Sequence, residues 1–240
     1  VKEYFNTKTK ARYQALVEAI RDAYKERIKK LDWMSDSTKQ KAYEKLAAIK
    51  SKVGYPDKWK DFGALKIDRG SYVLNIQRAN AWWWNYRISK LGKPVDRTEW
   101  DMSPQTYNAY YNPSNNEIVL PAGIFVVPGM RDEDLDDAFV YGYAAASTIG
   151  HEITHGFDDQ GRQYDKYGNL KNWWLPEDSA KFTQRAKKII NQFNEFNPVD
   201  TLHINGDATQ GENIADLGGL ELGLDAFKKT AAYAKNEPIG

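Results

Sequence analysis

Apolar residues recur at three- and four-residue steps in several stretches of this 240-residue chain, the spacing of one buried helical face. The segments expected to be helical are 8–31, Ser35 or Ser37 to Lys50, 70–91, 136–157, 176–194 and 211–233. Serine and threonine caps and glycine or proline breaks set most of these bounds. Asn205-Gly206-Asp207 is expected to form a turn, and Thr209 is the expected cap of the last helix.

The pattern changes to that of short strands near the middle of the chain. Residues 106–111 and 117–120 are strand-like runs, and Asn112-Pro113-Ser114-Asn115-Asn116 between them has the composition of a turn. These segments predict a small hairpin. With no internal repeat and no low-complexity linker, the expected fold class is α+β, mainly α, with one small sheet.

The composition is that of an ordinary globular protein, with 41% hydrophobic and 28% charged residues. No apolar run approaches the ~20 residues that cross a bilayer, so we expect no membrane segment in this chain. The chain starts at Val1 without an initiator Met, and we expect a piece of a longer protein.

The net charge of +1 is unevenly distributed. Residues 1–60 carry 16 Lys and Arg against 8 Asp and Glu, so the remaining residues carry 18 against 25. A basic segment can indicate nucleic-acid binding. Here the basic residues are interspersed with acidic ones, which favours the solvated faces of amphipathic helices, and we expect no nucleic-acid partner.

The run His151-Glu152-Ile153-Thr154-His155 carries the most specific chemistry. Positions four apart lie on one helical face, so the two imidazoles can reach one metal ion. Glu152 then lies beside the metal without having to bind it, the arrangement that zinc hydrolases use to activate water.

A catalytic zinc ion usually has three protein ligands and one open position. The chain has no cysteine, so the third ligand is expected to be His203 or a carboxylate. The best carboxylate is Glu212, and Asp216 one turn later can accept the free N–H of a ligand imidazole. Asp158 can do the same for His155.

These residues also have purely structural interpretations. The pentad could be an exposed polar patch, and Glu212 and Asp216 could be charges favoured near a helix N-terminus. His203 is expected to be a surface residue in a loop. The small apolar residues 143–149 nevertheless favour a buried helix, where a glutamate beside two histidines needs a partner such as a metal.

Two competing functions rest on other features. Eight tryptophans, including those at 82–84 and 173–174, could indicate a carbohydrate-binding module. Three consecutive helical positions point in three directions, so we expect core packing or domain contacts instead. A peptide-binding protein with an inactive site is the second alternative.

Beyond the pentad, the chain resembles the neprilysin-type zinc metallopeptidases. The resemblance extends from about residue 1 to about residue 235. It is carried by segments 33–34, 54–56, 108–113, 116–124, 150–161, 173–174 and 211–219.

The resemblance implies a role for each matching residue. It implies a thermolysin-like zincin catalytic domain in which His151, His155 and Glu212 bind one Zn²⁺ per chain. Glu152 would be the catalytic base, and Asp158 and Asp216 would orient the two histidines, Asp216 thereby serving catalysis. The segment with Asn108, Ala109 and Tyr110 would hold an oligopeptide substrate. Family members often cleave on the amino side of large apolar residues.

The chain departs from the family pattern at three places. A further His and Arg that the family places downstream are absent before Gly240, and most of a helical lid encoded upstream is absent too. Residues 143–148 differ from a glycine-rich family version, which we expect to affect packing only. Residues 1–240 are therefore expected to form the larger part of a catalytic domain.

The sequence thus predicts a zinc-dependent endopeptidase that cleaves oligopeptides through metal-activated water, with Glu152 as general base and acid. The alternative is a catalytically impaired fragment or peptide-binding protein that holds zinc without efficient turnover. The absence of cysteine favours a bacterial member of the family over disulfide-rich animal members. We expect a periplasmic or secreted location, while the oligomeric state stays open.

Overall fold

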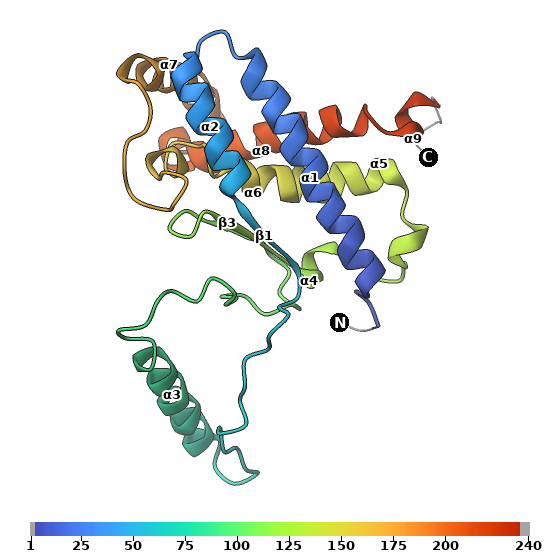
Figure 1. Cartoon of the computed structure of the whole chain (residues 1–240), viewed down its shortest axis with the longest axis vertical. Helices are drawn as coiled ribbons and strands as arrows, with labels where there is room; N and C mark the ends of the chain where they lie inside the picture. Colours follow the sequence, from blue (N-terminus) through green and yellow to red (C-terminus); the bar gives the residue numbers. More distant parts are fainter. Residues whose placement is uncertain (1–2, 236–240) are drawn as a thin grey trace. The chain divides into compact units, whose positions relative to one another are not determined.

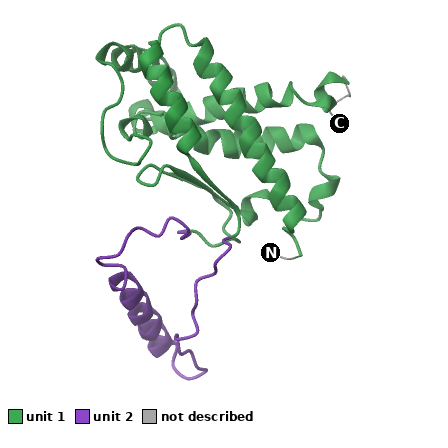
Figure 2. Ribbon diagram, in the orientation of Figure 1, with its two compact units in different colours: residues 1–55, 102–240 green, residues 56–101 purple. Residues whose placement is uncertain are grey.

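The computed structural model of the chain describes residues 3–235. It divides into two compact units, one formed by residues 1–55 with 102–240 and the other by residues 56–101 (Figure 2). The first unit contains the sheet and every residue predicted to form the metal site. The expected fold class, α+β and mainly α, is confirmed.

A three-stranded sheet lies in the first unit, with the order β1-β3-β2. Its strands are β1 (Lys50–Gly54), β2 (Tyr110–Asn112) and β3 (Glu117–Pro121). The predicted hairpin is confirmed as the antiparallel pair β2 and β3, although β2 is shorter than predicted. β1, which pairs with β3 in parallel, was not predicted, because its pairing partner is remote in sequence. The helix expected to reach Lys50 ends at Ala48.

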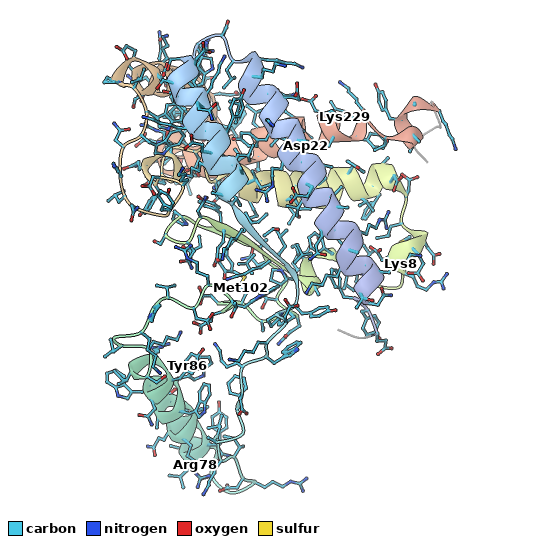
Figure 3. All side chains as sticks on the ribbon, in the orientation of Figure 1. Lys8, Asp22, Arg78, Tyr86, Met102 and Lys229 are labelled. Atoms are coloured by element: carbon cyan, nitrogen blue, oxygen red, sulfur yellow. The ribbon has the colours of Figure 1, made fainter. Side chains whose placement is uncertain are left out.

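The first two helices follow the sequence prediction closely. They are α1 (Thr7–Lys30) and α2 (Asp36–Ala48). Asn6 caps α1 by accepting from the amide of Thr9, and Ser35 caps α2 by accepting from that of Thr38. Burying each large apolar side chain of the inner face stabilises the fold by about 1.5–3 kcal/mol. Charged residues of α1 such as Lys8 and Asp22 are exposed (Figure 3).

The histidines lie at the end of a long helical segment, as predicted. Its parts are α5 (Asp137–Val140), the π-helix η2 (Tyr141–Gly150) and α6 (His151–Thr154). The π-helical middle was not predicted. In η2 the hydroxyls of Ser147 and Thr148 both donate to the carbonyl of Tyr143, at 2.5 and 3.4 Å. Such bonds compete with the regular backbone ladder and favour a departure from α-helical geometry.

The C-terminal helices of the first unit are α7 (Pro176–Asn194), α8 (Gly206–Phe227) and α9 (Ala231–Ala234). The bounds of α7 are confirmed. The predicted start of α8 was wrong, because Asn205 caps it by accepting from the amide of Ala208 at 3.0 Å. Asparagine favours both turns and helix caps, so this segment was mistaken for a turn. Thr209 instead lies in the first turn, where its hydroxyl donates to the Asn205 carbonyl.

The backbones of η2 and α8 approach each other through small residues. A Cβ on Gly219 would lie 2.4 Å from the carbonyl oxygen of Ala146, and one on Gly150 would lie 2.9 Å from the Cα of Gly219. Gly223 lies equally close to Ala146. Figure 1 shows α8 running beside the α5–α6 segment, with α1 crossing both. Only residues without large side chains permit this approach.

The pair Trp173 and Trp174 packs in the core of the first unit, with exposed fractions of 8% and 6%. Burial of this pair agrees with the expectation of core packing for the tryptophans. The short elements that complete the first unit are α4 (Ala122–Phe125) and the 3₁₀ turns η1 (Asp132–Asp134) and η3 (Gly161–Gln163).

The second unit contains α3 (Tyr72–Ile88), which confirms the predicted helix. The triple tryptophan does not pack in a core, because α3 has no buried residue and Trp84 is 64% exposed. The other expectation for these residues, contacts between domains, stays a prediction. Glu99 accepts from the hydroxyl of Tyr86 at 2.7 Å and pairs with Lys90 at 2.5 Å. Tyr86 is marked on α3 in Figure 3. This unit is too small to bury a helix face.

Over residues 3–235, no helix combines the length and the apolar character that a membrane span requires.

The close backbone contact between η2 and α8 at Ala146, Gly150, Gly219 and Gly223, here called the seam, gives a stability prediction. Gly219→Ala places a methyl group against the backbone of Ala146 and should lower the free energy of unfolding by about 1–3 kcal/mol. Gly142→Ala is the matched control in η2, because nothing lies within 4 Å of its added Cβ. Urea denaturation should show no loss for the control, since alanine favours helices by about 0.5–1 kcal/mol over glycine. Equal losses in both variants would contradict the importance of the seam.

Candidate metal centre

The two histidines of the pentad face each other at the end of the helical segment. His151 begins α6 and His155 is its C-cap, so their four-residue spacing places both imidazoles on one face. Their Nε2 atoms lie 3.0 Å apart, and the ring planes are nearly perpendicular at 87°. The structure therefore brings the two predicted ligands together.

Glu212 reaches the same point from α8. Its Oε2 atom lies 3.2 Å from Nε2 of His151 and 3.5 Å from Nε2 of His155. Neighbouring ligands of a tetrahedral zinc ion with bonds of ~2.0–2.1 Å lie about 3.3 Å apart. The three separations observed are close to that value. Within the described part of the chain, these three residues form the one group that could hold a metal ion.

A carboxylate holds the outer nitrogen of each imidazole. Nδ1 of His151 lies 2.8 Å from Asp216, and Nδ1 of His155 lies 2.7 Å from Asp158. A carboxylate only accepts hydrogen bonds, so each Nδ1 is assigned the proton. When both rings are neutral, the two Nε2 atoms present lone pairs to each other at 3.0 Å. Lone pairs so close repel unless a cation lies between them, so the donor set fits a divalent metal ion.

The two sides of this site differ in burial. The side chain of Asp158 is 6% exposed, whereas those of Asp216 and Glu212 are 73% and 69% exposed. Burial acts to lower the pKa of His155, but the hydrogen bond and charge of Asp158 outweigh it and raise that pKa. The buried carboxylate therefore interacts more strongly with its imidazole than an exposed one would.

Glu152 lies beside the three donors and is not one of them. It is 7% exposed, and burial raises its pKa, although the imidazoles of His151 and His155 act to lower it. The backbone of Tyr111 in β2 also bonds to this carboxylate and opposes the rise. A carboxyl with a raised pKa, at the edge of a metal site, is suited to accept and return a proton.

An open cavity of about 710 Å³ lies in front of the donor group. Its wall includes the predicted substrate residues Asn108, Ala109 and Tyr110, together with Tyr111. The amide of Ala109 donates to the side chain of Asn108 at 2.9 Å. The cavity therefore joins the strand predicted to hold substrate to the predicted metal ligands.

His203 lies apart from the site, and the sequence had favoured a surface position for it. Its side chain is exposed, and Nδ1 lies 3.2 Å from the carbonyl oxygen of Asn194. It does not belong to the group of possible metal ligands.

The sequence did not reveal the residues that support the site from behind. Asn116 accepts from the hydroxyl of Tyr111 at 2.9 Å and donates to the carbonyl of Lys45 at 3.2 Å. Lys45 is 1% exposed, although lysines are rarely buried. One signal was available in the sequence, because Lys45 lies three residues after the apolar Ala42 in the second predicted helix, where the two share a face.

The comparisons with known proteins agree with this geometry. A profile of peptidase family M13 matches residues 108–239, and a second profile of the same family matches residues 1–56. The chain belongs to peptidase family M13. The resemblance to neprilysin-type metallopeptidases is thereby confirmed.

Relatives of this M13 chain include animal and bacterial proteins. An endothelin-converting enzyme homologue of Locusta migratoria is 39% identical over 95% of this chain and 32% of its own length. A putative zinc metalloproteinase of Streptococcus gordonii is 38% identical over 97% of this chain and 41% of its own length. The chain thus spans between 29% and 41% of the length of such relatives.

Solved M13 structures share the fold. The zinc metalloprotease ZMP1 of Mycobacterium tuberculosis, solved in complex with an inhibitor, has a TM-score of 0.86 and 45% identity. That match covers 95% of this chain and 35% of the ZMP1 chain. PepO from Lactobacillus rhamnosis has a TM-score of 0.85 and 36% identity, over 92% of this chain and 35% of its own.

The donor geometry gives a binding prediction. Glu212→Ala removes the carboxylate nearest both Nε2 atoms and should weaken Zn²⁺ binding in a titration against a competing chelator. Glu221→Ala on the same helix is the control, because Glu221 pairs with Arg27 instead. Equal zinc affinity in the parent and Glu212→Ala would exclude Glu212 as a ligand.

Proposed function

We propose that this chain forms the metal-bearing part of a zinc-dependent endopeptidase that hydrolyses oligopeptides, with one zinc ion per chain. The observation that carries the proposal is the convergence of His151, His155 and Glu212 beside the buried Glu152. The names of relatives, among them two zinc metalloproteases, support the choice of metal and reaction.

The donor set suits zinc in a catalytic setting. Two imidazole nitrogens and one carboxylate oxygen would supply three ligands, the number that a catalytic zinc site takes from the protein when it keeps one position for water or substrate. Zinc supplies Lewis acidity, which polarises a carbonyl and lowers the pKa of water towards ~7. Asp158 and Asp216 act as positioning residues, because they hold the ring orientation and tautomer of the two histidines.

Glu152 would move the proton during hydrolysis. Its carboxylate accepts a proton from the attacking water, whose oxygen adds to the carbonyl carbon of the scissile peptide. As the C–N bond breaks, Glu152 returns that proton to the leaving nitrogen, so the products are an acid and an amine. Burial raises the pKa of Glu152 towards the working pH, where one carboxyl can both take up a proton and return it.

β2 would hold the substrate in an extended conformation. The order β1-β3-β2 places this strand at the edge of the sheet, and no strand of residues 3–235 pairs with its other side. An extended peptide can add to such an edge through backbone hydrogen bonds that do not depend on its sequence. The segment 108–111 lies in the cavity wall, so a peptide bound there passes close to Glu152.

Glu152→Gln tests the assigned base in the intact protein. The amide keeps the shape of the side chain but cannot take the proton, so kcat should fall by about 10²–10⁴-fold. Zinc affinity should stay at the parent value. Glu177→Gln, on the exposed first turn of α7, is the matched control and should leave cleavage of a quenched fluorescent peptide unchanged.

Removal of the metal separates an enzyme from a protein that only binds peptides. A chelator should abolish cleavage of the same peptide, and added Zn²⁺ should restore it, because the proposed reaction needs the Lewis acid. Peptide binding without any zinc-dependent cleavage would instead support the binding protein.

A further inference from the structure

Lys45 is the one described lysine that is fully buried, at 1% exposure. Its side chain extends from α2 towards the loop that follows His155. There Nζ donates to the carbonyl of Gly161 at 2.7 Å and to that of Tyr164 at 2.7 Å. An apolar residue would leave both carbonyls without this donor.

The surroundings of Lys45 are aromatic rather than acidic. Nζ lies 5.9 Å from the ring centre of Tyr111, 5.6 Å from that of Phe157 and 5.7 Å from that of Trp173. Burial lowers the pKa of Lys45 to about 7, although Asp158 and Asp165 act to raise it. An amine and an ammonium both have enough N–H groups for two carbonyls, so the contact survives either protonation state.

The loop that Lys45 holds is the loop that orients His155. The amide of Gly161 donates to Oδ1 of Asp158 at 2.6 Å, and the amide of Gln160 donates to the same atom at 2.9 Å. The other oxygen, Oδ2, lies 2.7 Å from Nδ1 of His155. A continuous series of contacts therefore runs from Lys45 through Gly161 and Asp158 to a predicted metal ligand.

The backbone leaves little room for this loop to adjust. A Cβ on Gly161 would lie 1.7 Å from the carbonyl oxygen of His155, so the two peptide groups are already in close contact. The amide of Arg162 also donates to the carbonyl of Asp158 at 3.1 Å. Lys45 therefore acts on a tight turn, and its removal should shift the carboxylate of Asp158 rather than a flexible tip.

We propose that Lys45 is a positioning residue of the metal centre, which fixes the turn 158–161 so that Asp158 holds the imidazole of His155 in place. This proposal rests on the proposed function, because it takes His155 as a zinc ligand. Lys45 touches neither metal nor substrate, and its effect passes through Asp158.

Zinc affinity of the intact protein is the first test. Lys45→Met fills the same volume without the two hydrogen bonds and should weaken Zn²⁺ binding about 10-fold, the lower end of the ~10–100-fold loss typical of residues that orient metal ligands. Lys41→Met is the matched control on α2. Lys41 is exposed and donates to the carbonyl of Trp173, outside the turn, so its replacement should not change the affinity.

A double-mutant cycle separates positioning from a general effect on stability. In the Asp158→Asn background, Lys45→Met should weaken zinc binding by much less than in the parent, because the group through which it acts is already altered. Equal losses in both backgrounds would overturn the proposal, as would parent affinity in a folded Lys45→Met. If Lys45→Met does not fold, the zinc affinity of Lys45→Gln is measured instead. Its side chain is shorter by one atom, and the affinity should fall by less than the roughly 10-fold loss expected for Lys45→Met. Parent affinity in a folded Lys45→Gln would also overturn the proposal.

The parent titration separates the two proposals. A parent that binds no zinc would overturn the proposed function and the role of Lys45 with it. A parent that binds zinc, with unchanged affinity in the folded Lys45 variants, would overturn the role of Lys45 alone.

Discussion

The close contact between the backbones of η2 and α8 is the constraint on which the metal centre depends. The seam is made by Ala146 and by Gly150, Gly219 and Gly223, and a Cβ on any of these glycines would lie within 3 Å of the opposing helix. His151 follows Gly150 directly, so the seam brings the start of α6 against α8, which carries Glu212 and Asp216. A metal site built from two helices needs their separation fixed to within a few tenths of an ångström, and packed backbones are stiffer than packed side chains.

The two helices contribute to the site in different ways. The α6 side is buried, and there Glu152 and Asp158 lie in a region where charges interact strongly. The α8 side is open to the cavity, where the exposed Glu212 can complete the donor group. This asymmetry suits the proposed hydrolysis, because Glu152, the proposed proton-transferring group, is largely buried while the exposed Glu212 faces the open cavity. Lys45 and Asn116 extend the buried side. Lys45 on α2 donates to the carbonyl of Gly161 in the loop, and Asn116, just before β3, donates to the carbonyl of Lys45.

The residues of the site could be predicted from the sequence better than the fold around them. The histidines could be paired because helical spacing is local, and Glu212 followed once cysteine was excluded and the family resemblance added. β1 was missed because its partner β3 is remote in the sequence. The π-helical geometry of η2 was missed because the bonds of Ser147 and Thr148 to the Tyr143 carbonyl cannot be read from the hydrophobic pattern. Lys45 was missed because lysines normally lie in solvent. The start of α8 was misplaced because Asn205 suits a turn as well as a cap.

Anomalous diffraction at the zinc edge, from crystals of the zinc-loaded intact protein, tests the central claim most directly. The account predicts one peak in this part of the molecule, about 2.0–2.1 Å from the Nε2 atoms of His151 and His155, with a carboxylate oxygen of Glu212 as third ligand. A zinc ion bound elsewhere, or one that binds the histidines while Glu212 points away, would contradict it.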